Sequence, residues 1–170
     1  MIETKRLQII PLPQEQLFLY IKADPLLEKQ LNIQPFARSF SRDLLEVFEH
    51  IILQRVADVK NKYEFFTLWI ILLREKRIAV GDLFFKGNPD ELGAIEIGYG
   101  IFEGFRSRGY MTEALAGMVD WAKHQPGVKT MIAETVITNQ ASLKILENNH
   151  FRLYRQKQAA VWFRLRLKNK

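Results

Sequence analysis

Hydrophobic and polar residues alternate along several short segments of this chain, which is the pattern of a β-strand with one buried face. Turn residues or helical segments separate these stretches. This alternation, together with short apolar runs such as residues 68–73, predicts strands over residues 7–12, 65–73, 78–85, 94–101, 131–137, 151–157 and 161–168. Arg74-Glu75-Lys76-Arg77, between the second and the third, is a polar turn that indicates a hairpin.

Elsewhere apolar residues recur at the spacing of an amphipathic helix. This spacing predicts helices over residues 14–22, 41–57 and 109–124, and another from an N-cap at Asn139 to about Asn149. The helix at 41–57 carries an apolar stripe made of Leu44, Leu45, Phe48, Ile51, Ile52 and Val56. Residues 94–137 form a strand–loop–helix–strand unit, and such crossovers are right-handed, so its two strands should run parallel.

The composition is that of one globular domain, which we assign to residues 1–170, since 48% of the residues are hydrophobic and 26% are charged. The absence of cysteine excludes disulfides and thiol catalysis, and the three histidines are far apart, so we expect no metal site. No signal peptide or apolar run of membrane-spanning length is present, which predicts a cytoplasmic protein without a membrane partner.

The net charge of +6 indicates either a solvated basic surface or attraction of an anionic ligand. Part of the excess lies near the C-terminus, where Trp162, Arg164, Arg166 and Lys168 alternate with Phe163, Leu165 and Leu167. This period of two places the arginines on the solvent side of a strand. No nucleic-acid-binding motif is present, so we do not expect a nucleic acid partner.

The most informative stretch runs from Gly98 to Ala114, where a strand enters a loop rich in glycine and arginine that opens into a helix. Such a junction directs unpaired backbone N–H groups, the positive end of a helix dipole and two guanidinium groups at one place. A pyrophosphate group fits that place. Ligands of open α/β sheets also tend to bind at the carboxyl ends of such strands.

Taken together, these segments resemble the GNAT superfamily of acyl-CoA-dependent N-acyltransferases, in particular the branch of the ribosomal-protein N-terminal acetyltransferases of the RimJ/RimL type. The resemblance covers nearly the whole chain. Its motifs are Glu3-Thr4-Lys5-Arg6-Leu7, Val80-Gly81-Asp82, Glu96-Ile97-Gly98-Tyr99, Arg106-Ser107-Arg108-Gly109-Tyr110-Met111 with Thr112-Glu113-Ala114, Asn139-Gln140-Ala141-Ser142, and Asn149-His150-Phe151. Two positions depart from the family pattern: Met111 stands where glycine or alanine is usual, and His150 replaces a glycine, which should strain the turn.

The resemblance implies a mixed α/β fold of the GNAT type. It consists of a twisted, mostly antiparallel sheet of about seven strands and about four flanking helices, with a V-shaped splay between the parallel fourth and fifth strands. It also implies acetyl-CoA as co-substrate. Its pyrophosphate would bind the backbone amides of Arg106, Ser107, Arg108, Gly109, Tyr110 and Met111. The Arg106 and Arg108 side chains would add charge-assisted contacts to the phosphates; the alternative is that both are solvated loop residues. The pantetheine arm would follow Gly100, Ile101 and Phe102, with Asn139 and Ser142 as contacts from the last helix.

The chemistry requires a base for the amine and an acid for the leaving thiolate. Glu96 and Glu134 are the candidate bases, and the alternative for each is a structural ion pair with an arginine. Burial in an apolar strand is expected for Glu134. Many relatives use a tyrosine as the acid, but the corresponding residue here is Leu146, so Ser142 is the candidate and Tyr99 the second choice.

We therefore predict transfer of an acetyl group from acetyl-CoA to a primary amine, on a peptide N-terminus or a small molecule, by direct attack. The alternative is a CoA-binding sensor or scaffold of the same fold without catalysis. Loops at 23–42 and 86–93, with Phe65, Trp69 and Phe85 nearby, are expected to shape the acceptor pocket, unless these aromatics belong to the core. A homodimer is a further expectation from the family.

Overall fold

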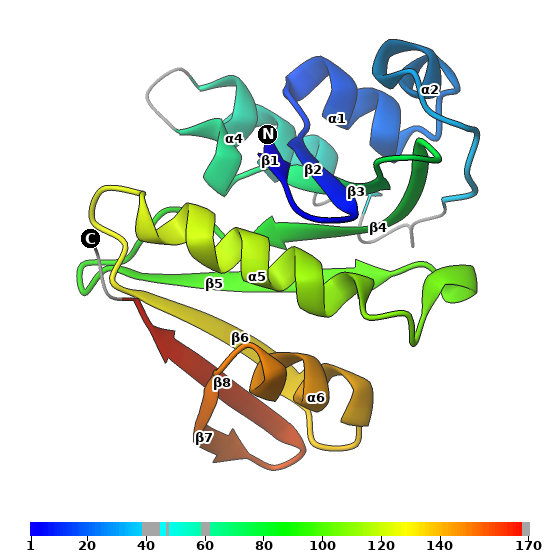
Figure 1. The fold of residues 1–170 in the computed structure, drawn as a ribbon. Helices are drawn as coiled ribbons and strands as arrows, with labels where there is room; N and C mark the ends of the chain where they lie inside the picture. Colours follow the sequence, from blue (N-terminus) through cyan, green and yellow to red (C-terminus); the bar gives the residue numbers. More distant parts are fainter. Residues whose placement is uncertain (39–44, 47, 59–61, 168–170) are drawn as a thin grey trace.

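An open, mostly antiparallel sheet forms the centre of the computed structural model, which describes residues 1–38, 45–46, 48–58 and 62–167 (Figure 1). The strands follow the order β1-β2-β3-β4-β5-β6-β8-β7. Their bounds are β1 Ile2–Glu3, β2 Leu7–Pro11, β3 Leu68–Leu73, β4 Ile78–Phe85, β5 Ala94–Ile101, β6 Thr130–Val136, β7 Arg152–Lys157 and β8 Ala160–Arg166. The seven predicted strands are present. The eighth, β1, has two residues, too few to show an alternating pattern.

The helices of the described residues are α1 Gln14–Ile21, α2 Leu26–Leu31, α4 Leu53–Ala57, α5 Tyr110–Lys123 and α6 Gln140–Asn148. A π-helical turn, Phe48–Ile52, leads into α4, and 3-10 turns occupy Tyr63–Phe65 and Glu103–Phe105. The helix predicted at 41–57 is thus confirmed over its second half, while residues 41–44 and 47 lie outside the described residues. Two predictions are wrong: α2 lies in a predicted loop, and β3 begins at Leu68 rather than at Phe65.

Helices cover the sheet on both faces. Helices α5 and α6 lie in front of β5 and β6 in Figure 1, whereas α1, α2 and α4 gather around the N-terminal strands. An aromatic cluster fixes α5 to the sheet: the Trp121 ring centroid lies 5.1 Å from that of Trp69, 5.5 Å from that of Phe85 and 5.4 Å from that of Phe65. The alternation of each strand directs Trp69 and Phe85 toward α5, so these aromatics belong to the core and do not line an acceptor pocket.

The parallel pair of strands is short. Strands β5 and β6 pair at Ala94↔Thr130, Ile95↔Met131 and Glu96↔Ile132, and beyond this point the two strands diverge (Figure 1). This divergence confirms the predicted splay, and among the described residues no strand pairs with the second half of β5 on its β6 side.

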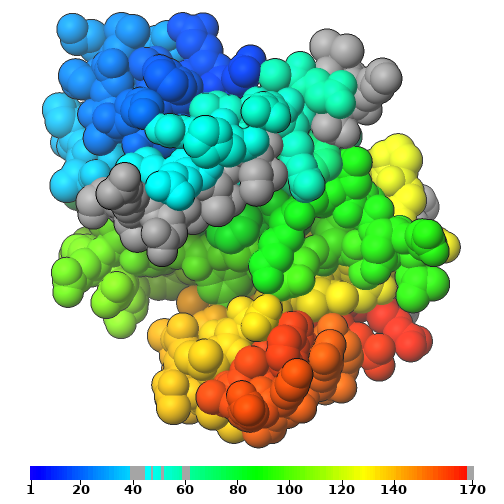
Figure 2. Space-filling model, turned by 180° about the vertical axis from the view of Figure 1, so that it is seen from behind, coloured from blue at the N-terminus to red at the C-terminus, as the bar shows by residue number. Residues whose placement is uncertain are grey.

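The last two strands form the far edge of the sheet. In β8, Val161 and Phe163 are buried while Arg164 and Arg166 are exposed, as the period of two predicted; Lys168 lies outside the described residues. All of β7 is exposed. Figure 2 shows the face turned away from α5 and α6: the blue-to-cyan N-terminal segment covers its upper part, and orange-to-red residues of the C-terminal strands form its lower part.

Candidate functional site

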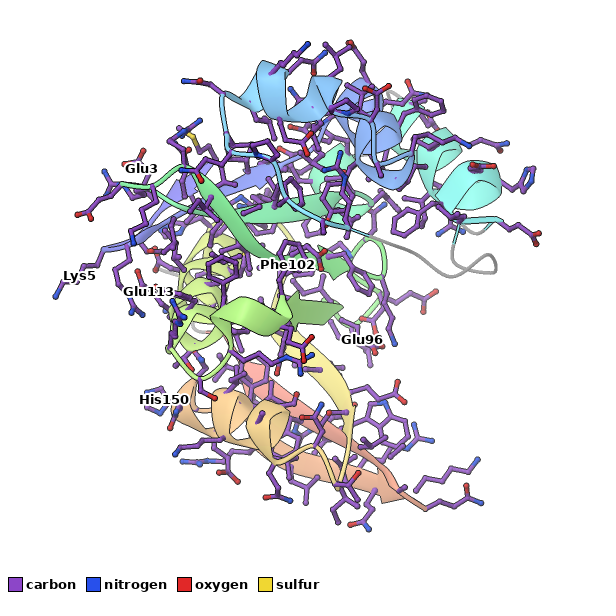
Figure 3. The ribbon with its side chains drawn as sticks, turned by 90° about the vertical axis from the view of Figure 1, so that its right-hand side faces the viewer. Glu3, Lys5, Glu96, Phe102, Glu113 and His150 are labelled. Atoms are coloured by element: carbon purple, nitrogen blue, oxygen red, sulfur yellow. The ribbon has the colours of Figure 1, made fainter. Side chains whose placement is uncertain are left out.

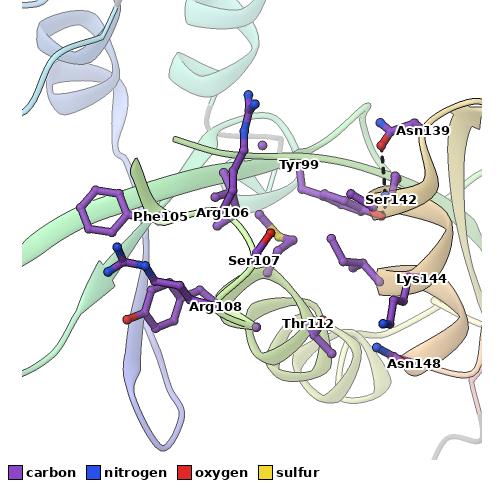
Figure 4. A pocket seen from close by; sticks show the side chains of 17 residues that line it. Tyr99, Phe105, Arg106, Ser107, Arg108, Thr112, Asn139, Ser142, Lys144 and Asn148 are labelled. Atoms are coloured by element: carbon purple, nitrogen blue, oxygen red, sulfur yellow. Dashed lines mark hydrogen bonds between the residues drawn. The ribbon is translucent and has the colours of Figure 1, made fainter. Parts of the chain in front are cut away.

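A cavity of about 790 Å³ opens where β5 and β6 diverge (Figure 4). Its size falls within the range of small-molecule and cofactor sites. Its walls come from the end of β5, the following loop, the start of α5 and one side of α6. They comprise Tyr99, Gly100, Ile101, Phe105, Arg106, Ser107, Arg108, Gly109, Tyr110, Met111, Thr112, Asn139, Ala141, Ser142, Lys144, Ile145 and Asn148.

The loop presents a row of backbone donors to this cavity. Gly109, at the N-cap of α5, has φ +75°, and Ser107 has φ +59°, so the chain turns twice through the left-handed region before the helix starts. Across the described residues, the six N–H groups from Ser107 to Thr112 have no hydrogen-bond acceptor, and the first intrahelical bond is Glu113 N–H to the Gly109 carbonyl at 3.1 Å. Such a row at a helix N-terminus is an anion-binding arrangement.

Three cationic side chains stand around these donors. Arg106 and Arg108 are exposed, and neither forms an ion pair with a carboxylate of the described residues. The Arg108 guanidinium lies 5.8 Å from the Phe105 ring centroid. Lys144 projects from α6 on the other side (Figure 4). The Met111 side chain is 3% exposed and packs into the core, so its bulk does not block the row of N–H groups.

Phe102 is the one predicted cofactor residue that the cavity lining does not include. Its N–H donates to the Val80 carbonyl at 2.9 Å, its own carbonyl accepts from the Phe105 N–H at 2.9 Å, and its ring stacks on Phe36. Because the strand alternates, the Phe102 ring lies on the opposite face from Tyr99 and Ile101. Phe102 therefore lies outside the residues that line the cavity.

The two candidate acids lie in direct contact with each other. The Tyr99 and Ser142 hydroxyl oxygens are 3.0 Å apart across the splay, from β5 to the first turn of α6. Asn139 caps this helix by accepting the Ser142 N–H at 3.1 Å, which confirms the predicted N-cap. Burial raises the pKa of Tyr99 above its ordinary value, and the hydrogen bond with Ser142 offsets part of that effect. Leu146, at the position of the family tyrosine, is fully buried.

The two candidate bases share one partner, Lys86. The Lys86 ammonium forms an ion pair with Glu96 Oε1 and lies 3.4 Å from Glu134 Oε2. The expected arginine partners are thus replaced by one lysine. Burial alone would lower the pKa of Lys86, but Glu96 and Glu134 outweigh it and raise the pKa. Glu134 is 39% exposed, so the expectation that it is buried is wrong.

Glu96 lies on the opposite face of the sheet from α5 and α6. Figure 3 shows Glu113 and His150 on the helical side, at the left, and Glu96 at the right. The neighbours of Glu96 along the strand, Ile95 and Ile97, are buried beneath α5. The cavity and the candidate bases are therefore reached from opposite faces, with β5 between them.

Sequence reasoning missed Lys144 and Asn148 as cavity residues. Both lie on the face of α6 that also carries Ala141 and Ile145, at the three- and four-residue spacing of one helix side. With Asn139 as the N-cap, this helical spacing alone could have predicted that Lys144 and Asn148 share a side of the helix with Ala141.

A second group of contacts holds the loop in place. Glu113 in α5 accepts hydrogen bonds from Thr4 Oγ1 at 2.6 Å, from the Arg6 backbone N–H at 2.7 Å and from Arg6 Nε at 2.6 Å. Arg6 Nη1 also donates to the Arg108 carbonyl at 3.1 Å, and the guanidinium lies 4.7 Å from the Tyr110 ring centroid. Two motifs from opposite parts of the sequence thus meet at the cavity rim.

Among the described ranges, no three histidine, cysteine, aspartate or glutamate side chains gather as a metal-binding group would. No helix in the same part of the chain has the length and hydropathy needed to cross a membrane.

The splayed sheet, the cavity and its row of donors define a class of acyl-transferring proteins, and comparison of sequences agrees. The family model described as "Acetyltransferase (GNAT) domain" matches residues 6–152. The chain belongs to the GNAT acetyltransferase family.

One similar sequence is YjdG of Bacillus subtilis, an uncharacterized N-acetyltransferase that is 29% identical over 151 residues, covering 89% of each chain. RimL, a ribosomal L7/L12 α-N-protein acetyltransferase solved with coenzyme A, superimposes with a TM-score of 0.68 at 18% identity, covering 98% of this chain and 97% of RimL. The ribosomal-protein-S5-alanine acetyltransferase of Vibrio fischeri gives a TM-score of 0.68 at 15% identity, covering 96% and 94%. At these identities the two structures establish the fold.

Proposed function

We propose that this protein transfers an acetyl group from acetyl-CoA to a primary amine by direct attack, with both substrates bound together. One observation carries the proposal: the six N–H groups from Ser107 to Thr112 line the cavity between the diverging strands without acceptors in the described residues. A pyrophosphate is the ligand that such a row accommodates. That RimL was solved with coenzyme A supports this choice.

In this proposal the backbone from Ser107 to Met111 binds the pyrophosphate, and Arg106, Arg108 and Lys144 supply positive charge around it. The pantetheine arm follows the unpaired edge of β5 at Tyr99, Gly100 and Ile101, and Asn139 contacts it from α6 while keeping its role as N-cap. Acetyl-CoA supplies the acetyl group as a reactive thioester.

The acceptor amine must lose a proton before it attacks. We assign this step to Glu96, on the face opposite the cavity, with Glu134 as the second candidate. The ion pair with Lys86 supports the assignment, because it shows that an ammonium group fits against the Glu96 carboxylate. Lys86 is 49% exposed, so its flexible chain has room to move aside for an acceptor.

The leaving thiolate needs a proton donor. Ser142 lines the cavity, and its hydroxyl is hydrogen-bonded to Tyr99, whose raised pKa keeps the phenol protonated at neutral pH. We assign the proton to Ser142, with Tyr99 as the group that can replenish it. This pair takes the role for which many relatives use a tyrosine at the position of Leu146.

A CoA-binding sensor or scaffold without catalysis is the second candidate. The specific observation in its favour is Lys86, which compensates the charge of both candidate bases at once. In that case the cavity would still bind CoA, but no amine would be acetylated.

Release of the CoA thiol separates the two candidates. Acetyl-CoA is incubated with a panel of primary amines that begins with peptide N-termini, and calorimetry measures CoA binding to the same preparations. We expect amine-dependent thiol release that Glu96→Gln reduces by roughly a hundredfold or more, with CoA affinity unchanged. Glu91→Gln, an exposed residue of the turn after β4, is the matched control.

Normal turnover in both Glu96→Gln and Glu134→Gln would refute the base assignments. CoA binding without thiol release from any amine would favour the sensor. Absence of CoA binding by the folded protein would overturn both candidates. The wider proposal also includes the RimJ/RimL branch, one domain over residues 1–170, a cytoplasmic location and a homodimer.

A further inference from the structure

Two arginines lie directly opposite each other at the far edge of the sheet. Arg152 of β7 pairs with Arg164 of β8, and both residues are exposed. Among the residues that the structure describes, neither guanidinium has a hydrogen-bond acceptor or a carboxylate partner. Like charges directly opposite on neighbouring strands destabilise a sheet, so an anion bound between the two arginines would offset their repulsion.

Further cations and two aromatic rings surround this pair. The Arg155 guanidinium lies 4.7 Å from the Trp162 ring centroid, and the Arg164 guanidinium lies 5.1 Å from that of Tyr154. A ring against a guanidinium restrains its position and leaves its N–H groups available to an anion. We call this surface the basic face, and its exposed cations are Arg152, Arg155, Lys157, Arg164 and Arg166.

The basic face lies on the same side of the sheet as Glu96, the proposed base. Glu96 of β5 pairs with Ile132 of β6, and Ile132 pairs with Arg164. Arg164 pairs in turn with Arg152, so these four residues form one row across the sheet and point to the same face. At the usual strand spacing, Arg164 is about 10 Å and Arg152 about 14 Å from Glu96. Figure 2 shows the C-terminal strands at the surface of this face.

Charge changes sign along this row. At one end, Glu96 and Glu134 share the ammonium group of Lys86, whereas the cations of the basic face have no carboxylate partner in the described part of the chain. A nucleic acid would bring its phosphates against the two glutamates, and a second copy of this chain in a two-fold contact would place the basic face against itself. A peptide that carries a free amino group, followed by acidic residues, complements both ends of the row.

We propose that the amine acceptor is a polypeptide N-terminus with acidic residues at about its third to fifth positions, whose carboxylates bind Arg164 and Arg152. The inference rests on the proposed acetyl transfer and names the acceptor class of the same site. The amino group of the acceptor replaces the Lys86 ammonium at Glu96. Because an extended chain advances about 3.3 Å per residue, it reaches Arg164 at about its third or fourth residue and Arg152 at about its fifth.

Three ten-residue peptides test the inference on the wild-type protein. Each has a free amino group and an amidated C-terminus. The first has glutamate at its third to fifth positions, the second has glutamine there, and the third has its glutamates at the last three positions. Thiol release from acetyl-CoA gives kcat and KM for each peptide. We expect the KM of the first to be about tenfold or more below those of the other two, and the difference to shrink as the salt concentration rises.

The double variant Arg152→Gln, Arg164→Gln removes both charges and keeps exposed polar side chains, so the fold should persist, which thermal melting checks. We expect the KM of the first peptide to rise about tenfold, to that of the glutamine peptide, with kcat and CoA affinity unchanged. Lys29→Gln, at an exposed position of α2 far from the C-terminal strands, is the matched control. If the double variant does not fold, Arg164→Glu gives the same test, because its carboxylate occupies Arg152 in place of the peptide.

The outcomes also separate this inference from the proposed function. Acetylation with equal KM for the first peptide and either of the others, or a preference that the double variant keeps, would overturn the inference and leave the reaction standing. If calorimetry shows that the first peptide binds the CoA-saturated protein through the two arginines but is never acetylated, the site stands and the reaction is refuted. Tighter binding of a ten-nucleotide oligouridylate, or a dimer that dissociates in the double variant, would assign the basic face to RNA or to a second copy and overturn the inference.

Discussion

Arg6 binds Glu113 across 107 positions of the sequence. Both the backbone N–H and the Nε of Arg6 donate to the carboxylate, at 2.7 and 2.6 Å, and Nη1 of the same guanidinium reaches the Arg108 carbonyl. The N-terminal segment therefore fixes the first turn of α5 and the loop before it. The loop leaves six N–H groups without an acceptor in the described part of the chain, and Arg6, which does not line the cavity, helps to hold this geometry.

Removing the charge of Glu113 should destabilise the fold. Glu113→Gln weakens the bonds from Thr4 and Arg6, and because the Arg6 side chain is 42% exposed we discount the loss for solvent screening and expect about 1–2 kcal/mol at neutral pH. Urea unfolding of wild type and Glu113→Gln measures this loss in the free energy of unfolding. A difference near zero would mean that water replaces these bonds without cost.

The same pair predicts an acid dependence. Burial raises the pKa of Glu113, but the hydrogen bonds from Thr4 and Arg6 outweigh it, so the folded pKa lies below the ordinary value. A lowered pKa contributes stability above the unfolded pKa, and that contribution is lost as the pH falls through the folded value. The difference in the free energy of unfolding between wild type and Glu113→Gln should therefore disappear in acid. A difference that persists in acid would contradict the lowered pKa of Glu113.

Gly109→Ala should weaken CoA binding through the backbone. An alanine at φ +75° costs about 1 kcal/mol or more, which the loop can relieve by rotating N–H groups away from the cavity. We expect CoA affinity to fall about tenfold by calorimetry. Gly104→Ala is the control, since its Cβ meets no atom of the described ranges within 4 Å and its φ is not in the left-handed region. Equal losses in both variants would point to general loop damage.

Ser142→Ala tests the proton donor without disturbing the helix. The Asn139 cap binds the backbone N–H of Ser142, which alanine keeps. We expect kcat to fall about tenfold to a hundredfold with little change in CoA affinity, and a smaller fall for Tyr99→Phe. Unchanged kcat in the Ser142→Ala and Tyr99→Phe variants would move the proton donor elsewhere, for example to water.

His150→Gly should stabilise the protein. His150 has φ +65°, where a side chain costs about 1–2 kcal/mol, and the greater freedom of glycine in the unfolded chain cancels part of the gain. A net increase of about 0.5–1 kcal/mol is expected from denaturant unfolding. His150→Ala keeps the Cβ and should show no such gain; a gain in alanine as well would assign the effect to the imidazole.

Local patterns predicted the elements that a contiguous segment defines. Alternation and short apolar runs predicted seven strands, residue type predicted the helix N-cap at Asn139, and the glycine and arginines of the loop at 106–111 predicted an anion site. Helix α2 was not predicted because its six residues after Pro25 are too few to show a helical hydrophobic periodicity. The strained turn at His150 was expected from the missing glycine.

Contacts between distant segments were not readable in the same way. Lys86 belongs to a turn, and its link to Glu96 and Glu134 depends on the pairing of β4 with β5 and on the divergence of β6. Whether a glutamate in an apolar strand is buried depends on what covers that face of the sheet, and Glu134 is exposed there. Phe102 follows the cavity residues in the sequence, but its side chain lies on the opposite face of the sheet, against Phe36.

The short parallel ladder has a mechanical consequence. Strands β6, β8 and β7 are joined to β5 by three residue pairs, and the Asn149 side chain adds a bond to the Thr112 carbonyl at 3.2 Å. Beyond this short ladder, side chains bridge the splay: Lys86 lies 3.4 Å from Glu134, and the Tyr99 and Ser142 hydroxyls are 3.0 Å apart. A ligand that fills the splay contacts β5 on one side and α6 on the other. Its binding therefore stabilises the association of the C-terminal strands with the rest of the sheet. Amide hydrogens of β6 and β8 should then exchange more slowly once the cavity is occupied.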